Sequence, residues 1–358
     1  MISILYKNYI GDNDKALEYY TKEIEQNPNA DWVYGNRGNL YFAHVKDTVK
    51  AIDDFNMMIN INPSFTNYKR RASFYNDEIN DYDKAIADYN KAIKIYKNLY
   101  PDVSFKDSQE EGLGELHEYR AKILFKTKKY EAAISDWISA IQVDSSYSGY
   151  ANYRIGTIYL EGVRDFDQAI KHFSNSIDLN YWQLKYAYDG RGTAYLNLKK
   201  YKLALKDFNK AIELESENAT PYLSRLSYYI LVGNFEKAIN EAEKVIKMDR
   251  DDPQGFYYLA YIYNKTQSYY KALNYLAIAI EKHINNEVSE GSYFIGSLNN
   301  LDVIELYELY SLRASIYNLL GVKEMACKNY NTAKDLVLED SDSYNEIQKL
   351  ISENCNSE

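Results

Sequence analysis

Six arginines recur at one position of a repeating pattern and could bind anionic groups, because a guanidinium holds a phosphate or carboxylate through two parallel hydrogen bonds. In five cases an acidic residue follows 16 or 17 positions later, and two copies of the pattern that lack the arginine also lack the acid. Since a buried guanidinium needs a partner, this covariation predicts a bridge inside each repeat rather than a ligand site. The pairs are Arg37 with Asp54, Arg71 with Asp88, Arg120 with Asp136, Arg191 with Asp207 and Arg225 with Glu241, whereas Arg313 faces Asn329.

The residues that most often act as catalysts or metal ligands are too scattered to form such sites. The four histidines are far apart, at His44, His117, His172 and His283. The sequence contains no HExxH motif, no glycine-rich phosphate loop and no Ser/His/Asp constellation. We therefore expect a protein that is not an enzyme, with no catalytic residue, no metal site and no cofactor.

The acids of the predicted bridges lie in a helical pattern that recurs nine times, which we call the seam. It consists of an alanine, then usually an aromatic residue four positions later, a small residue seven later and an isoleucine eight later. Offsets of four, seven and eight fall on one face of an α-helix, so we expect this face to be buried. The alanines are Ala16, Ala51, Ala85, Ala133, Ala169, Ala204, Ala238, Ala272 and Ala326.

A second helical pattern precedes each seam and pairs a small residue with a bulky one three positions later, as in Gly38–Tyr41 and Gly192–Tyr195. Six of the eight intervals between successive seam alanines are 34 to 36 residues long. With phrases such as YDGRGTAYLNLKKYKLALKDFNKAIELE, the pattern resembles the tetratricopeptide repeat, whose period is about 34 residues. The resemblance covers roughly residues 1–336 and implies an all-α fold, a right-handed α-solenoid (superhelix) of stacked antiparallel helix pairs.

We expect about nine such repeats over residues 1–336, the first of them truncated, followed by a capping helix and tail at 337–358. Repeat arrays need a cap because the last helix pair would otherwise expose its apolar face. Two intervals are longer, at 48 and 54 residues, which predicts insertions near 100–115 and 285–302. Each insertion is either a loop that meets a partner or a surface turn that tolerates extra residues.

In proteins of this family the first helix of each pair lines a concave surface, and the resemblance assigns several side chains to it. Asn36, Asn39, Lys69 and Arg70 make a cluster of amides and cations suited to a peptide carboxylate. Its register agrees only in part with the carboxylate clamp of chaperone-binding family members. The other candidates are mostly tyrosines, which are enriched in interfaces but number 39 in this chain. They are Lys122, Tyr150, Tyr153, Arg154, Tyr186, Tyr257, Tyr258 and Tyr261.

Only two cysteines are present, Cys327 and Cys355. They meet if the last helices run antiparallel, and a disulfide there indicates an oxidising, extracytoplasmic location, periplasmic or at the cell surface. The alternative is two unrelated thiols. Because the first residues lack the features of a signal peptide, we expect a cytoplasmic location if the chain is complete.

Charge and hydropathy narrow the range of partners. The net charge of −10 disfavours nucleic acid, and no apolar run approaches the roughly 20 residues that span a bilayer. We interpret the chain as a non-enzymatic scaffold that binds a partner peptide or domain in its concave groove, with its oligomeric state left open. The alternatives are a targeting or regulatory module of a larger enzyme or secretion assembly, and a surface for a small ligand or glycan.

Overall fold

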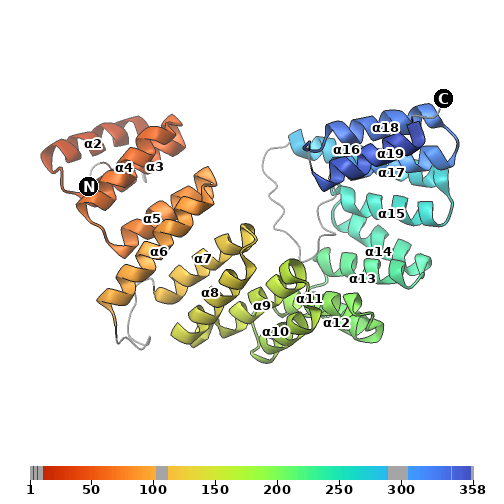
Figure 1. The fold of residues 1–358 in the computed structure, drawn as a ribbon, viewed down its shortest axis with the longest axis horizontal. Helices are drawn as coiled ribbons and strands as arrows, with labels where there is room; N and C mark the ends of the chain where they lie inside the picture. Colours follow the sequence, from red (N-terminus) through yellow and green to blue (C-terminus); the bar gives the residue numbers. More distant parts are fainter. Residues whose placement is uncertain are drawn as a thin grey trace. The chain divides into compact units, whose positions relative to one another are not determined.

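The computed structural model describes Ser3, Tyr6 and residues 11–101, 112–288, 305–339 and 341–355. Over these residues the chain consists of helices and short turns, without a strand, which confirms the predicted all-α class. The chain divides into two compact units, residues 1–151 and 152–358. Within each unit, consecutive helices form antiparallel pairs, and each pair packs on the next (Figure 1).

The helices of each unit have the following bounds. The first unit includes α2 (Asn13–Gln26), α3 (Asp31–Leu40), α4 (Thr48–Ile61), α5 (Phe65–Phe74), α6 (Tyr82–Leu99), α7 (Leu113–Lys126), α8 (Tyr130–Val143), η4 (Ser145–Tyr147) and the start of α9 (Ser148–Thr157). The second includes the rest of α9, α10 (Phe166–Asp178), α11 (Leu184–Asn197), α12 (Tyr201–Leu214), α13 (Thr220–Leu231), α14 (Phe235–Met248), α15 (Pro253–Lys265), α16 (Tyr269–Val288), α17 (Leu306–Leu319), α18 (Lys323–Asp335) and α19 (Asp342–Cys355).

The predicted seam forms the core of both units. All nine seam alanines are at most 1% exposed, and the aromatic residues that follow them, such as Phe55, Trp137 and Phe208, are buried with them. An alanine at this position lets the second helix of a pair approach the first closely, and the aromatic ring fills the space beside it. The buried seam is therefore confirmed.

The turn between the two helices of a repeat exists in two lengths. In three repeats a π-helical turn widens the end of the first helix, at η2 (Tyr41–Val45), η3 (Tyr75–Ile79) and η5 (Ile158–Val163). These are the repeats in which the small residue and the seam alanine are 13 residues apart, as in Gly38 to Ala51, rather than 12, as in Ala121 to Ala133. The π turn thus absorbs the extra residue and keeps the two helix faces in register.

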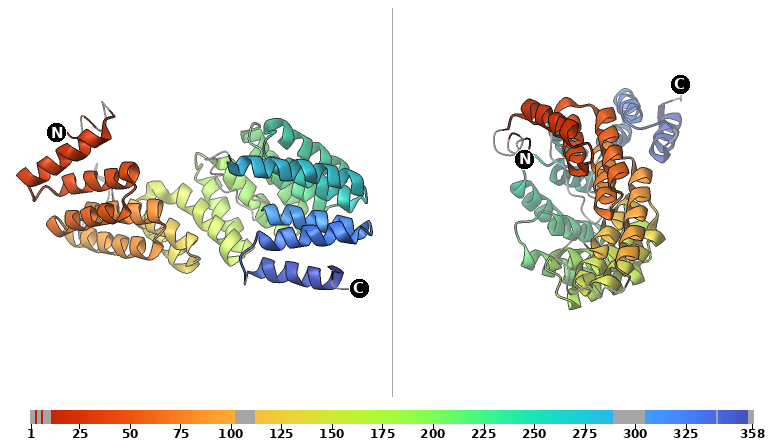
Figure 2. Two further views of the ribbon diagram at one scale, coloured as in Figure 1. Left: turned by 90° about the horizontal axis from the view of Figure 1, so that it is seen from above. Right: turned by 90° about the vertical axis from the view of Figure 1, so that its left-hand side faces the viewer.

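The C-terminal helix α19 lies against α18 at the end of the second unit (Figures 1 and 2). Its residue Ile347 is buried, and Leu350 and Ile351 pack on the cluster that contains Tyr330. The insertions predicted near 100–115 and 285–302 lie mostly outside the described residues, although α7 begins at Leu113 and α16 continues to Val288. No helix in the described part of the chain is long and apolar enough to cross a bilayer.

Candidate functional site

The five predicted arginine–carboxylate bridges all form. Arg71 is typical: its Nε donates to Asp88 Oδ2 at 2.7 Å and its Nη2 to Asp88 Oδ1 at 2.9 Å. The carboxylates are 3–5% exposed, and each arginine comes from the first helix of a repeat and each acid from the second. The other pairs are Arg37–Asp54, Arg120–Asp136, Arg191–Asp207 and Arg225–Glu241. These arginines are occupied inside the fold, so the bridge prediction is confirmed.

Each of these arginines also binds the preceding repeat, which the sequence interpretation missed. Its Nη1 donates to a polar side chain one position after the seam aromatic of that repeat. The acceptors are Thr21, Asn56, Asn90, Ser174 and Asn209. Where the next repeat has no arginine, the corresponding residues are Ile138 and Glu243. The sequence carries this second signal only at some repeats, because Glu243 is polar and Ala277, at the same position before Arg313, is not.

Tyrosines flank the bridging arginines and account for part of their abundance. The Arg37 guanidinium lies 5.7 Å from the ring of Tyr34 and 5.5 Å from that of Tyr41. Arg71 has the same arrangement, between the rings of Tyr68 and Tyr75. Cation–π contacts of this kind add to the ion pairs, so these tyrosines serve the framework of the repeats rather than an open surface.

A groove of about 650 Å³ opens in the first unit between the first helices of two successive repeats. One side is formed by α3 and η2, and the other by α5 and η3. It contains three residues of the predicted amide-and-cation cluster, Asn39, Lys69 and Arg70, and the fourth, Asn36, accepts a hydrogen bond from Arg70 Nη2 at 2.7 Å. The structure thus brings this predicted cluster together.

Arg70 differs from the bridging arginines because it forms no salt bridge with any residue in the described ranges. Burial lowers the pKa of its guanidinium, and the carboxylate of Asp31 counters this effect only in part. The guanidinium lies against Gly35, where an added Cβ would be 2.6 Å from Arg70 Nη1. A partly desolvated cation on the wall of a groove can bind an anion strongly, since the cost of removing its water has already been met in the folded state.

Lys69 and Lys122 are less available than Arg70. Lys69 is 9% exposed, and its Nζ lies 3.1 Å from Glu115 Oε2 and 5.2 Å from the ring centre of Tyr119. Lys122 pairs with Glu118 at 2.7 Å and lies 5.9 Å from the ring of Tyr150. Both charges are therefore largely compensated within the first unit, and these lysines contribute less to a ligand site than the sequence cluster indicated.

Two of the predicted surface tyrosines pack inside the second unit. Tyr153 is 9% exposed and lies against Phe173, Tyr181 and Tyr186, with ring centres 5.7 to 6.3 Å apart. Tyr258 is 5% exposed. Because these rings fill the space between helices, Tyr153 and Tyr258 do not present the open contact surface that the sequence interpretation assigned to them.

The remaining predicted tyrosines and Arg154 are half-buried. Tyr257 and Tyr261 form a pair on α15, with ring centres 6.4 Å apart. Burial and the nearby carboxylate of Glu308 raise the pKa of Tyr257 to about 12, so its hydroxyl stays protonated at neutral pH.

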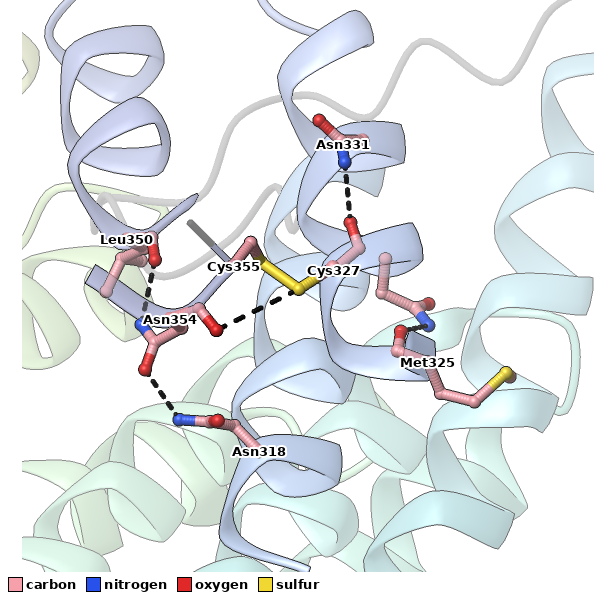
Figure 3. Close-up of a disulfide and its surroundings, with 8 residues drawn as sticks. Asn318, Met325, Cys327, Asn331, Leu350, Asn354 and Cys355 are labelled. Atoms are coloured by element: carbon pink, nitrogen blue, oxygen red, sulfur yellow. Dashed lines mark hydrogen bonds between the residues drawn. A yellow bond between two sulfur atoms is a disulfide. The ribbon is translucent and has the colours of Figure 1, made fainter. Parts of the chain in front are cut away.

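The two cysteines form a disulfide that joins α18 to α19 (Figure 3). Their Cα atoms are 5.6 Å apart, and their sequence separation is 28 residues. Beside the disulfide, Asn318 Nδ2 donates to Asn354 Oδ1 at 2.7 Å, which ties the end of α19 to α17 as well (Figure 3). The last helix is thus held covalently and by side-chain hydrogen bonds.

Two of the histidines, His117 and His172, take part in the framework. His117 is buried, and its Nδ1 lies 2.7 Å from Asp136 Oδ1, so it shares that carboxylate with Arg120. His172 Nδ1 lies 2.9 Å from Asn152 Oδ1, and burial lowers the pKa of its imidazole. Within the described ranges, no group of three histidine, cysteine, aspartate or glutamate residues could hold a metal ion.

Comparisons with known proteins agree on the repeat. Models of the tetratricopeptide repeat match residues 68–99, 187–218 and 219–252. Serine/threonine-protein phosphatase 5 from Mus musculus is 35% identical over 89 residues, which are 25% of this chain and 18% of the phosphatase. The Hsp70-Hsp90 organising protein of Plasmodium falciparum is 25% identical over 113 residues, 30% of this chain and 20% of that protein. The chain therefore spans a fifth or less of the length of these two curated relatives.

A solved structure covers much more of the chain. A tetratricopeptide repeat protein from Parabacteroides merdae superposes with a TM-score of 0.59 at 17% identity, over 82% of this chain and the whole of that one. At this identity the likeness concerns the fold.

Proposed function

Because this chain is a tetratricopeptide repeat protein, we propose that it is a scaffold whose first unit binds a partner peptide in the groove between α3 and α5. The environment of Arg70 is the observation that supports this function most directly. It is a partly buried guanidinium without a carboxylate partner among the described residues, on the wall of a groove of about 650 Å³. Each of the five bridging arginines, including Arg71 on the same helix, has such a partner, whereas the Arg70 guanidinium forms no salt bridge with a described residue and can bind a carboxylate of a ligand.

The chemistry of the groove fits a peptide. Arg70 would hold a carboxylate, from an acidic side chain or a chain end, while Asn39 offers its side-chain amide to the peptide backbone. The relatives named above support a role in holding other proteins, since one of them is named as an organiser of Hsp70 and Hsp90.

Peptide selection on the full chain tests the proposal. Random linear peptides displayed on phage are selected against the wild-type protein, and fluorescein-labelled copies are titrated by fluorescence polarisation. We expect the selected peptides to share a carboxylate, and Arg70→Ala to weaken their binding about 10- to 100-fold, the value of a hydrogen-bonded charge pair. Lys94→Ala, which removes an exposed cation of the same unit outside the groove, should leave affinity within about twofold.

Two further results complete the test. The circular dichroism spectrum and the melting temperature of Arg70→Ala should match those of the wild type. Undiminished binding of the selected peptides by Arg70→Ala would contradict a carboxylate site in this groove.

The disulfide supports a second proposal, that the protein works in an oxidising compartment outside the cytoplasm. Mass spectrometry of peptides from the native protein, alkylated before lysis and digested without reductant, tests it. A linked peptide pair containing Cys327 and Cys355 is expected, and two alkylated thiols would contradict the proposal.

A further inference from the structure

The groove in the first unit carries opposite charges at two points along its length. Arg70, Phe74 and Asp77 lie at intervals of four and three residues, which places them on one face of the continuous helix α5–η3. Glu78 also lines the groove, next to Asp77. At about 1.5 Å per helical residue, the cation and the acids are separated by about 10 Å along the helix axis.

The two carboxylates at the acidic end of the groove, like the guanidinium of Arg70, form no salt bridge with a described residue. Asp77 accepts a hydrogen bond from Asn76 Nδ2 at 2.6 Å, but neither Asp77 nor Glu78 forms a salt bridge with a described residue. Both side chains are exposed. The nearest lysine on the same helix, Lys69, is already paired with Glu115 at 3.1 Å. A cation that entered this end of the groove would therefore meet two uncompensated carboxylates.

An apolar surface lies between the charged ends. It is formed by Phe42 and Ala43 of η2 and by Phe74 of α5, and the rings of Phe42 and Phe74 meet edge to face at 5.3 Å. Phe74 is buried, while Phe42 is partly exposed on the wall of the groove. Along its length the groove thus offers a cation, an apolar wall and a pair of acids.

We propose that the occupant is an extended segment of a partner protein in which an acidic residue, an apolar residue and a lysine or arginine follow one another within about four residues. This inference rests on the proposed peptide-binding function and adds the charge pattern of the ligand. An extended chain of the polyproline II type advances about 3.1 Å per residue and returns a side chain to the same face every three residues, so residues three apart match the 10 Å between Arg70 and Asp77. The acid meets Arg70, the apolar side chain lies on Phe42, and the basic side chain meets Asp77 and Glu78.

Four capped, fluorescein-labelled octapeptides are the probes. The first has a glutamate and a lysine three positions apart with leucines between them; the second replaces the lysine by glutamine, the third replaces the glutamate by glutamine, and the fourth replaces the lysine by glutamate. We expect the full-length protein at low salt to bind the first about two- to fivefold more tightly than the second, the range for exposed charge pairs. The third should bind weakest, because it has nothing to offer Arg70.

Variants of the acidic end then test where the lysine binds. Asp77→Asn with Glu78→Gln should abolish the difference between the first and second peptides. Asp77→Lys with Glu78→Lys should reverse the preference, so that the fourth peptide binds more tightly than the first. The matched control is Asp53→Lys with Glu131→Lys, which changes the net charge equally at exposed acids of the same unit outside the groove and should keep the wild-type order.

The outcomes separate this inference from the function beneath it. Equal binding of the first and second peptides by the wild type, or a preference that survives the Asp77 and Glu78 substitutions, would overturn the charge pattern. If Arg70→Ala still weakens binding in that case, the carboxylate site stands without it. If Arg70→Ala has no effect on any of the four peptides, both proposals fail.

Discussion

Arg70 on α5 and Arg154 on α9 occupy the same position of the repeat, two residues before the small residue of a first helix. Their surroundings differ in the size of the neighbouring side chains. Gly35, Asn36 and Ser73 lie around Arg70 or line its groove. Arg154 follows Tyr153, whose ring packs among three other aromatic rings of the second unit.

This difference teaches how one framework produces both an open site and a packed face. The seam is the same in both repeats and sets the spacing of their helices, although the repeat of α9 has Ile155 and His172 in place of the bridging arginine and its acid. The space between the first helices of neighbouring repeats depends on the side chains at a few positions near the small residue. Short polar side chains leave a groove between α3 and α5, and tyrosines pack between α9 and α11.

The largest effect is expected where an aromatic ring fills that space. Tyr153→Ala should destabilise the second unit by about 3–5 kcal/mol, as for other buried aromatic residues cut to alanine, because it leaves a cavity beside Phe173. Hydrogen exchange of α9, α10 and α11 measures the loss. Tyr270→Ala, at a 76% exposed tyrosine of the same unit, should change exchange very little. A Tyr153→Ala protein with wild-type protection would mean that this ring is not part of the core.

The second unit also ends on a covalent link. Replacing both Cys327 and Cys355 by alanine should cost about 3–4 kcal/mol in the chain-entropy account, for a closed loop of this length. The effect should be confined to α17, α18 and α19, with affinity in the groove of the first unit unchanged. Hydrogen exchange before and after the substitution tests this, and reduction of the wild-type protein should reproduce it. Unchanged protection of α19 would show that the hydrogen bonds of Asn354 hold the helix without the disulfide.

Much of the fold could be predicted because the same residue pattern recurs in every repeat. The seam alanines recur at regular spacings within one chain. The arginines of the five bridges occur in the same repeats as their acids, at a spacing of 16 or 17 residues. The change from 17 to 16 residues between arginine and acid also carried structural information, since the longer spacing coincides with a π turn. That signal was present in the sequence but has no meaning until the shape of the turn is known.

The candidate site could be predicted only in part, because it depends on contacts that have no fixed spacing. Lys69 and Arg70 are neighbours in sequence, yet Lys69 pairs with Glu115 in the next repeat while Arg70 lies against Gly35. Tyr153 and Tyr186 were both assigned to the surface by their position, and only the packing of the rings shows that Tyr153 is buried. Because tyrosine occurs at both surface and core positions of this chain, residue type does not separate the two.

A smaller effect should follow from crowding the Arg70 guanidinium at Gly35. In Gly35→Ala the new Cβ would be 2.6 Å from Arg70 Nη1 and from Met58 Sδ, so both side-chain ends must move. Alanine is also the better helix former by about 0.5–1 kcal/mol, which offsets part of the strain. We expect stability to change by less than about 1 kcal/mol and affinity for carboxylate peptides to fall several-fold. Gly255→Ala crowds Ile246 in the second unit and should leave that affinity unchanged; a fall with both variants would point to a general loss of structure.

The smallest difference between the units concerns pH. Burial lowers the pKa of His172 below its ordinary 6.5, so the folded second unit favours the neutral imidazole. The stability that His172 contributes is therefore complete above pH 6.5 and is lost as the pH falls from there through the folded pKa. Between about pH 7.5 and about pH 5, His172→Gln should weaken the pH dependence of unfolding in urea, read out by hydrogen exchange of α10.

The control is His44→Gln, at an exposed histidine of the first unit, which should leave the pH dependence of exchange in α10 as in the wild type. Arg70 keeps its charge throughout this range because a guanidinium is effectively always protonated in proteins, so peptide affinity in the groove should not follow the loss of stability. A parallel fall of both quantities would show that the two units do not respond to acid independently.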